Sequence, residues 1–204
     1  MPDHYQNYRE LQLAHQVEID YRIRSSFRSE SALILAIHAG GIEMGTSELA
    51  QAIAGNEYSL YMFEGTISNS QILHITSTNF DEPACLALVK KHHAALSLHG
   101  FADLPGDPLI YLGGNDLALL QRLLEALMAN GYPARVNAGK FAATDPANIC
   151  NRTSLGQGVQ LELSARLRSQ FFENYLTHQG RKTCTPQFWY FVQVIRQVLL
   201  PQGG

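Results

Sequence analysis

Histidine and glutamate side chains in this sequence have the chemistry of a metal site. His38 ends a short apolar run, a pair of glycines follows, and Glu43 comes next. His99 ends a second apolar run and is also followed by a glycine. Imidazole nitrogens and carboxylate oxygens bind zinc, and a catalytic zinc keeps three protein ligands and one open position for water. We therefore expect His38, Glu43 and His99 to be the ligands of a catalytic zinc ion.

The spacing between His38 and Glu43 is longer than in a metal motif carried by one helix. Gly40 and Gly41 supply a turn there, because glycine tolerates backbone conformations that other residues avoid. Such a turn lets Glu43 fold back toward the metal of His38. Glu48 is the alternative carboxylate ligand, although it falls inside a predicted helix.

A second carboxylate is needed to move protons. A zinc ion lowers the pKa of a bound water and polarises a carbonyl, but a base must take the proton from that water and pass it to the leaving amine. Glu162 lies late in a predicted strand, with Gln160 and Ser164 on the same face. We expect Glu162 to be this catalytic residue, and Glu64, at another strand end, is the alternative.

A structural role for the histidines stays open, because a histidine at a strand end is commonly a hydrogen-bonded structural residue. We expect His74, His92 and His93 to be structural or exposed. Cys150 could serve as a ligand but has no paired cysteine. A purely structural zinc more often has a fourth protein ligand, commonly cysteine.

Hydrophobic periodicity predicts the elements that position these residues. Strands are predicted over residues 32–38, 58–64, 73–77, 95–99, 109–112, 134–137 and 158–164. Helices are predicted over residues 46–54, 84–92, 117–129, 166–175 and 187–199, and residues 8–17 of an otherwise irregular or edge segment are partly helical. Strands that alternate with helices are typical of an α/β fold with a mostly parallel sheet flanked by helices.

The ends of the predicted strands favour one shared site. Ligands of open α/β sheets collect outside the carboxyl ends of the strands. His38 and His99 end their strands, and Glu162 lies late in a third. If these strands are parallel neighbours, the three side chains lie near the same edge of the sheet.

Length and composition indicate one enzyme-like globular domain. The chain has 204 residues, of which 46% are apolar and 16% charged, and a net charge of −3. We expect a single zinc hydrolase domain over residues 1–204, with residues 1–30 as a peripheral N-terminal segment, and a monomer. The balance of charges does not favour a nucleic-acid partner, and no apolar run approaches the roughly 20 residues that cross a bilayer.

Cysteine content and the N-terminus bear on the compartment. The three cysteines are far apart and odd in number, which fits reduced thiols better than a disulfide framework. The N-terminus has no apolar signal core. We expect a cytoplasmic protein, or one released without a signal peptide.

Five sequence blocks, in one order across residues 32–168, resemble the phage-type poly-γ-glutamate hydrolase family. They are HAGGIEMGTSELA at 38–50, LHGF at 98–101, LGGND at 112–116, NICNR at 148–152 and GVQLEL at 158–163. The resemblance implies a zinc peptidase similar to metallocarboxypeptidases, with a mixed, mostly parallel twisted sheet and helices on both faces. It also implies His38, Glu43 and His99 as zinc ligands and Glu162 as the catalytic base.

One departure concerns the residues that would bind the substrate carboxylate. In metallocarboxypeptidases an Asn-Arg pair with this role precedes the last zinc histidine, whereas Asn151 and Arg152 follow His99 here. A planar guanidinium suits a carboxylate because it binds in a bidentate manner. We expect Asn151 and Arg152, with Arg166 as a second choice, to bind substrate, and a surface arginine that ties down a loop is the alternative.

These observations predict a zinc-dependent hydrolase of amide bonds, acting on γ-linked polyglutamate or a related acidic peptide. A deacylase or a cell-wall peptidase is the alternative that keeps the metal and changes the substrate. A non-catalytic binding module of the same fold is the alternative without chemistry, although such a module would have little need for Glu162 beside a full ligand set.

Overall fold

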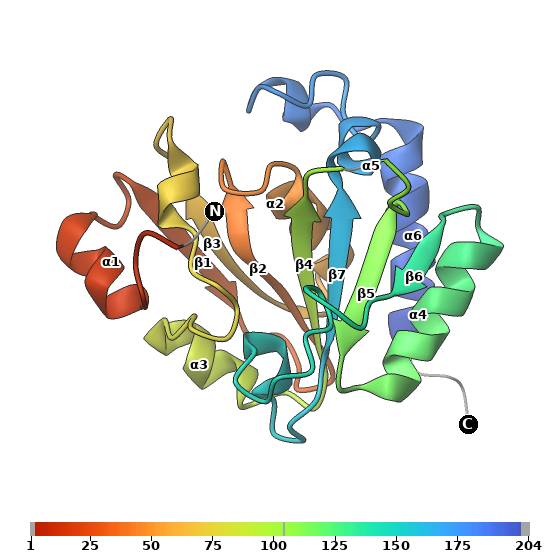
Figure 1. Ribbon diagram of the computed structural model, residues 1–204, viewed down its shortest axis with the longest axis horizontal. Coiled ribbons are helices and arrows are strands. Elements are labelled where there is room, and N and C mark those ends of the chain that lie inside the picture. Colours follow the sequence, from red (N-terminus) through yellow and green to blue (C-terminus); the bar gives the residue numbers. More distant parts are fainter. Residues whose placement is uncertain (1–2, 104, 201–204) are drawn as a thin grey trace.

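The computed structural model of the chain describes residues 3–103 and 105–200. Its strands form a single sheet in the order β1-β3-β2-β4-β7-β5-β6 (Figure 1). The strands are β1 Tyr21–Ser26, β2 Leu33–Gly40, β3 Ser59–Gly65, β4 Ala95–Phe101, β5 Ile110–Gly114, β6 Ala134–Val136 and β7 Val159–Ser164.

The centre of the sheet is parallel and its two edges are reversed. β3, β2, β4 and β7 run in the same direction. β1 is antiparallel to β3, and β5, with β6 parallel to it, is antiparallel to β7. The prediction of a mixed, mostly parallel α/β sheet is confirmed. The carboxyl ends of β2, β4 and β7 meet at the top of Figure 1.

Helices cover both faces of the sheet (Figure 1). One face carries four α-helices, and the other carries two α-helices with short 3-10 turns. The first group is α2 Thr46–Ala54, α4 Leu117–Ala129, α5 Ala165–Ser169 and α6 Pro186–Leu199. The second group is α1 Tyr8–Ala14, α3 Pro83–Val89, η1 Ser70–Leu73 and η2 Ile149–Asn151, and η3 Gly180–Lys182 lies in the loop before α6.

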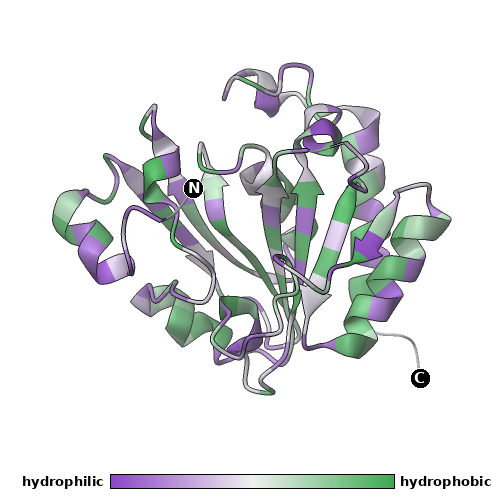
Figure 2. Ribbon diagram, viewed as in Figure 1, coloured by the Kyte–Doolittle hydropathy of each residue, from purple (hydrophilic) through white to green (hydrophobic). Residues whose placement is uncertain are grey.

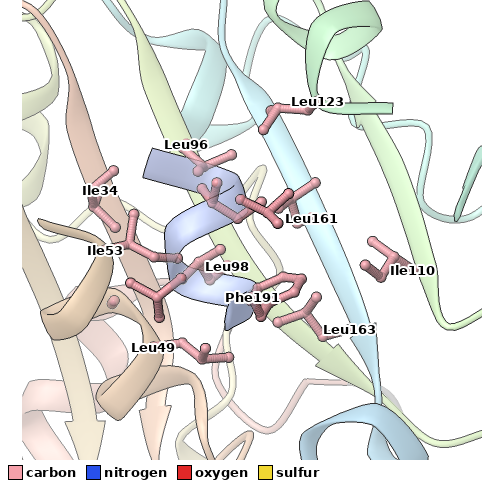
Figure 3. Packing of buried hydrophobic residues seen from close by; sticks show 14 of the residues in the cluster. Ile34, Leu49, Ile53, Leu96, Leu98, Ile110, Leu123, Leu161, Leu163 and Phe191 are labelled. Atoms are coloured by element: carbon pink, nitrogen blue, oxygen red, sulfur yellow. The ribbon is translucent and has the colours of Figure 1, made fainter. Parts of the chain in front are cut away.

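The larger core lies between the sheet and α2, α4 and α6. Figure 3 shows Leu96 and Leu98 of β4 and Leu161 of β7 packed toward Phe191 of α6 and Ile53 of α2. All five are at most 1% exposed. Each such side chain stabilises the fold by roughly 1.5–3 kcal/mol relative to exposure. This core therefore fixes the strands whose opposite face carries the polar residues described below.

Alternation along the central strands sends their side chains to opposite faces. On β2, Leu33 and Leu35 pack with the α1 and α3 side, and Ile34 packs with the α2 side. Figure 2 shows hydrophilic bands that interrupt the hydrophobic β4 and β7. Ser97 of β4 and Gln160 of β7 are buried polar residues.

Two predictions of local structure were wrong, and one edge strand was not predicted as a strand. Residues 73–77 do not join the sheet: Leu73 and Ile75 are buried against its face, so the apolar alternation reflects packing on the sheet rather than pairing within it. The helix expected over residues 166–175 ends at Ser169. β1 was missed because its arginine-bearing sequence has the short, charged character of an edge strand.

The described part of the chain holds its cysteines as free thiols, as expected. None of the described helices has the length and apolar character needed to cross a bilayer.

Candidate metal centre

His38 lies near the carboxyl end of β2, at an irregularity in the pairing with β3 between Ala36 and Ala39. Its side chain is 2% exposed. The His38 Nε2 atom lies 2.8 Å from the carbonyl oxygen of Ile75 and must donate to it, because a carbonyl only accepts. In the neutral ring this bond leaves the Nδ1 lone pair free for a metal ion, a support that metal-binding histidines commonly have.

A tight turn brings Glu43 back onto His38. The Glu43 backbone N–H donates to the carbonyl oxygen of His38 at 2.8 Å. Gly40 has a φ of +69°, and a Cβ added there would lie 2.4 Å from the carbonyl oxygen of Gly65. Both constraints require glycine at position 40, which agrees with the turn that the sequence predicts.

The imidazole Nδ1 atoms of His38 and His99 and the two carboxylate oxygens of Glu43 lie close together. His38 Nδ1 lies 3.1 Å from Glu43 Oε1 and 3.0 Å from His99 Nδ1. His99 Nδ1 lies 3.5 Å from Glu43 Oε2. Ligand atoms at the corners of a zinc tetrahedron with bonds of about 2.0–2.1 Å are separated by about 3.3 Å. The arrangement of these donor atoms therefore fits a zinc ion.

The charges of the cluster also fit a cation. Burial lowers the pKa of His38, but the Glu43 carboxylate, the hydrogen bond to Ile75 and the charge of Glu162 together outweigh it, and the net pKa of His38 is raised. Burial opposes the ionisation of Glu43, yet His38 and His99 hold the pKa of Glu43 well below its usual range. Both directions favour an ionised carboxylate beside a protonated imidazole in the metal-free cluster. A metal ion would take the place of that proton.

His74 lies against the same cluster, which sequence reasoning missed. Its ring stacks on His38 with the centroids 3.9 Å apart. Its Nδ1 atom lies 2.7 Å from Asp3 Oδ1. Burial and the charge of His38 lower the pKa of His74 to about 4, so it is neutral at pH 7. One donor atom each from His38, Glu43 and His74 lie within 4.8 Å of one another, which makes His74 a rival third ligand to His99.

Glu162 lies beside the cluster on the neighbouring strand. His99 of β4 and Glu162 of β7 are paired in the parallel register, so their side chains share a face. Gln160 Nε2 donates to Glu162 Oε1 at 2.8 Å, and Asn148 Nδ2 donates to Gln160 Oε1 at 3.1 Å. Burial, with a contribution from Glu43, raises the pKa of Glu162 to about 7. A carboxyl group with this pKa can exchange a proton near neutral pH.

Arg168 supports the cluster from the other side of β4, and nothing in the sequence pattern singled it out. Its buried guanidinium donates to the carbonyl oxygens of Leu163, Met44 and Phe101. A Cβ at Gly100 would lie 2.4 Å from this guanidinium, so the glycine makes room for it. The Gly100 N–H in turn donates to Glu43 Oε2 at 2.8 Å.

The residues expected to bind substrate hold loops in this structure. Asn151 Nδ2 donates to the carbonyl oxygens of Ala143 and Asp145. Arg152 Nε donates to the Ala147 carbonyl oxygen at 2.9 Å. Their role in substrate binding stays a prediction, and the structure adds this structural role to it.

Arg166 lies with its side chain half exposed near Asp103. Its backbone N–H donates to Asp103 Oδ2 at 2.7 Å, while its Nε atom is 3.9 Å from Asp103 Oδ1. Its Nη2 atom donates to the Asp107 carbonyl oxygen. These contacts leave a substrate role for Arg166 a prediction as well.

Glu48 and Glu64, the alternatives to Glu43 and Glu162, lie away from the cluster. Arg181 Nε donates to Glu48 Oε1 at 3.1 Å, and Arg24 Nε is 3.0 Å from Glu64 Oε2 without the angle of a hydrogen bond. Glu48 and Glu64 both line a cavity of about 510 Å³ whose wall includes none of the cluster residues. Cys150 is buried beside Asn151.

Comparison with protein families gives a match over nearly the whole chain. The family model described as poly-gamma-glutamate hydrolase matches residues 5–194. The protein YndL of Bacillus subtilis is 38% identical over 200 residues, which cover 97% of this chain and 78% of YndL. The SPbeta prophage-derived protein YoqZ of the same organism is 39% identical over 191 residues, 92% of this chain and 68% of YoqZ.

Solved structures agree with these relatives. A bacteriophage poly-gamma-glutamate hydrolase superposes with a TM-score of 0.92 at 35% identity, covering 97% of this chain and 96% of that one. A zinc-free apo structure of YndL superposes with a TM-score of 0.90 at 37% identity, covering 97% and 98%. An N-formylglutamate amidohydrolase from Ralstonia eutropha shares the fold alone, with a TM-score of 0.52 at 12% identity and coverage of 89% and 96%.

Proposed function

Because this chain belongs to the poly-γ-glutamate hydrolase family, we propose that it is a zinc-dependent hydrolase that cleaves the γ-glutamyl bonds of poly-γ-glutamate. The observation that carries the proposal is the meeting of His38, Glu43 and His99 at 3.0–3.5 Å beside the buried Glu162. Support for zinc also comes from the relative YndL, whose apo structure is described as zinc-free.

His38, Glu43 and His99 would hold the metal through two nitrogens and a carboxylate oxygen. When bound, zinc would supply Lewis acidity, which lowers the pKa of a water and polarises a carbonyl. The hydrogen bonds to Ile75 and Gly100 fix the orientation of His38 and Glu43 before any ligand arrives. Such preorganisation avoids the cost of ordering the ligands during the reaction.

Glu162 is proposed as the residue that holds the transferred proton. In the metal-free protein its pKa of about 7 places it between a strong acid and a strong base at neutral pH. It would take a proton from the attacking water and return it to the leaving amine nitrogen as the amide bond breaks. Gln160 holds one carboxylate oxygen, and this fixed orientation leaves the other free for the proton.

Chain length of the polymer after incubation tests the proposal. The protein, stripped with a chelator and then restored with zinc, is incubated with poly-γ-glutamate, α-linked polyglutamate and an N-acylated glutamate. We expect shortening of the γ-linked polymer alone, and only after zinc is restored. Equal cleavage of the α-linked polymer would contradict the linkage, and preference for the acylated amino acid would indicate a deacylase. Binding of the polymer without cleavage would indicate a non-catalytic module.

A further inference from the structure

A loop after β6 lies over β5 and over β7, the strand that carries Glu162. In Figure 1 this teal segment crosses in front of β5 and β7. The Gly114 N–H donates to the Ala142 carbonyl oxygen at 2.8 Å. A Cβ on Gly113 would lie 2.3 Å from the Phe141 carbonyl oxygen, so only glycine lets the loop backbone approach β5 this closely. Gly113 and Gly114 therefore allow the loop to pack against β5.

Asparagine side chains fix the conformation of this loop. Asn137 Oδ1 accepts from the backbone N–H groups of Gly139 and Phe141, at 2.7 and 3.1 Å. Asn115 Nδ2 donates to the Thr144 carbonyl oxygen at 3.1 Å, and Asn151 Nδ2 donates to that of Ala143 at 2.7 Å. Asn115 of the LGGND block and Asn151 of the NICNR block thus help to hold this loop, whose tip is residues 140 and 141.

Phe141 anchors the tip of the loop beside Glu162. Its ring lies 5.6 Å from the rings of Phe101 and Tyr111. Tyr111 is the antiparallel neighbour of Glu162 on β5, and Phe101 is the last residue of β4. These aromatic rings form a wall that joins the loop to the strands on either side of β7, which carries the proposed base.

Lys140 is a free cation on this wall. Its side chain is exposed, and its Nζ atom lies 5.0 Å above the Phe141 ring. Its charge opposes, as a minor contribution, the rise that burial causes in the pKa of Glu162. Within residues 3–103 and 105–200, no carboxylate forms an ion pair with Lys140.

Three other cations, Arg168, Arg181 and Arg24, already have partners, whereas Arg166 keeps a half-exposed side chain 3.9 Å from Asp103. Arg168 is occupied by carbonyl oxygens, and Arg181 is paired with Glu48. Arg24 is close to Glu64. Lys140 therefore combines a place over Phe141, whose ring contacts the strand neighbour of Glu162, with a charge that no ion pair uses within the described residues.

The proposed substrate needs such a charge. A γ-linked glutamate chain uses its side-chain carboxyl groups in the amide bonds, so every residue keeps a free α-carboxylate. That carboxylate would enter a site where Glu43 and Glu162 are acidic, and like charges repel. We propose that Lys140 is a specificity-determining residue that binds the α-carboxylate of the glutamyl residue next to the scissile bond. This inference rests on the proposed function.

Substitution of Lys140 tests the inference on turnover. Lys140→Met keeps the length and apolar contacts of the side chain, and Lys140→Glu reverses its charge. We expect the KM for poly-γ-glutamate to rise about tenfold in K140M and further in K140E, with kcat changed much less, because the charge positions the ground state and the transition state alike. Added salt should raise the KM of the wild type more than the KM of K140M, because salt screens the charge of Lys140.

Lys91→Met is the matched control. Lys91 is also exposed and also lies over a phenylalanine ring, that of Phe27 at 5.8 Å, but it precedes the amino end of β4. We expect wild-type KM in K91M. Zinc content and the thermal midpoint are measured for all variants, so that a folding defect is recognised. An unchanged KM in both K140M and K140E would overturn the inference while leaving the proposed function intact.

A binding measurement decides the inference even if the proposed reaction is wrong. Fluorescently labelled poly-γ-glutamate and its α-methyl ester are titrated by anisotropy into zinc-loaded E162Q and E162Q/K140M. We expect about tenfold weaker binding of the acid form in the double variant and no difference for the ester. Equal affinity of the two proteins for the acid form contradicts a role for Lys140, whatever the wild type cleaves.

Discussion

His99 and Glu162 are direct neighbours across the parallel pair of β4 and β7, so the proposed metal ligand and a buried carboxyl group emerge at the same depth of one sheet face. The two side chains also interact electrostatically, because His99 opposes the rise that burial causes in the pKa of Glu162. The sheet, rather than a mobile loop, sets the distance between the metal centre and the proposed base.

Glu162→Gln separates metal binding from proton transfer. The amide keeps the shape of the side chain but cannot accept the proton. General-base catalysis typically contributes about 10²–10⁴-fold, and we expect kcat to fall by that factor while zinc content stays at about one ion per chain. Turnover and metal content are measured on the same preparation. Near-normal turnover would exclude Glu162 as the base, and loss of zinc would show that it supports the ligands instead.

The pH dependence of kcat/KM reports the ionisation of Glu162. Its pKa of about 7 in the metal-free protein is raised, so the carboxyl group is protonated and inactive as a base below that value and ionised above it. Activity should therefore increase with pH. A bound zinc ion favours the ionised form, so the midpoint of the rise should lie at or below about pH 7.

Gln160→Leu should shift that midpoint upward. The substitution removes the N–H that donates to Glu162 at 2.8 Å, and loss of a donor to a carboxylate raises its pKa. Kinetic profiles of both proteins over pH 4–9, at constant ionic strength and saturating zinc, check the direction. A midpoint that stays in place or moves down would argue against Glu162 as the group that titrates.

Zinc affinity distinguishes the two possible third ligands. His99 Nδ1 faces both His38 and Glu43, whereas His74 Nδ1 is engaged by Asp3. We expect His99→Ala to lose stoichiometric zinc and His74→Ala to retain it with an affinity about 10–100-fold weaker, as for loss of a residue that packs against a ligand. Competition with a chromogenic chelator measures both. The reverse order would assign the third position to His74.

The clustering of His38, Glu43, His99 and Glu162 could be predicted because its determinants are local. An apolar run followed by histidine places His38 near a strand end. The glycines after it allow the tight turn that returns Glu43 to His38. The parallel neighbours β2, β4 and β7 then bring His99 and Glu162 to the same region. Strand pairing itself followed from the alternation of strands and helices rather than from any one residue.

What could not be predicted depends on contacts between distant parts of the chain. His74 lies in a segment that packs over the sheet, so neither its stacking on His38 nor its bond to Asp3 has a signature in the sequence. Arg168 is buried only because Gly100, 68 positions earlier, leaves space for its guanidinium. Such tertiary complementarity has no periodicity and no fixed spacing.

Gly113→Ala should displace the loop that carries Lys140. The added methyl group would lie 2.3 and 2.4 Å from the carbonyl oxygens of Phe141 and Ala142, and these are backbone atoms that cannot rotate away. We expect the free energy of unfolding to fall by about 1–3 kcal/mol, the usual cost of overpacking. The KM for poly-γ-glutamate should rise as well, because the loop must move away from β5.

Gly139→Ala is the control from the same loop. Its nearest neighbour, Asn137 Oδ1, lies 3.5 Å from the added Cβ, which is an ordinary contact. Its stability should change by no more than about 1 kcal/mol in either direction. Urea denaturation and steady-state kinetics are compared for both variants. If Gly113→Ala kept the wild-type stability and KM, close packing of the loop on β5 would not be what positions Lys140, whereas equal losses in both variants would point to a general intolerance of the loop to substitution.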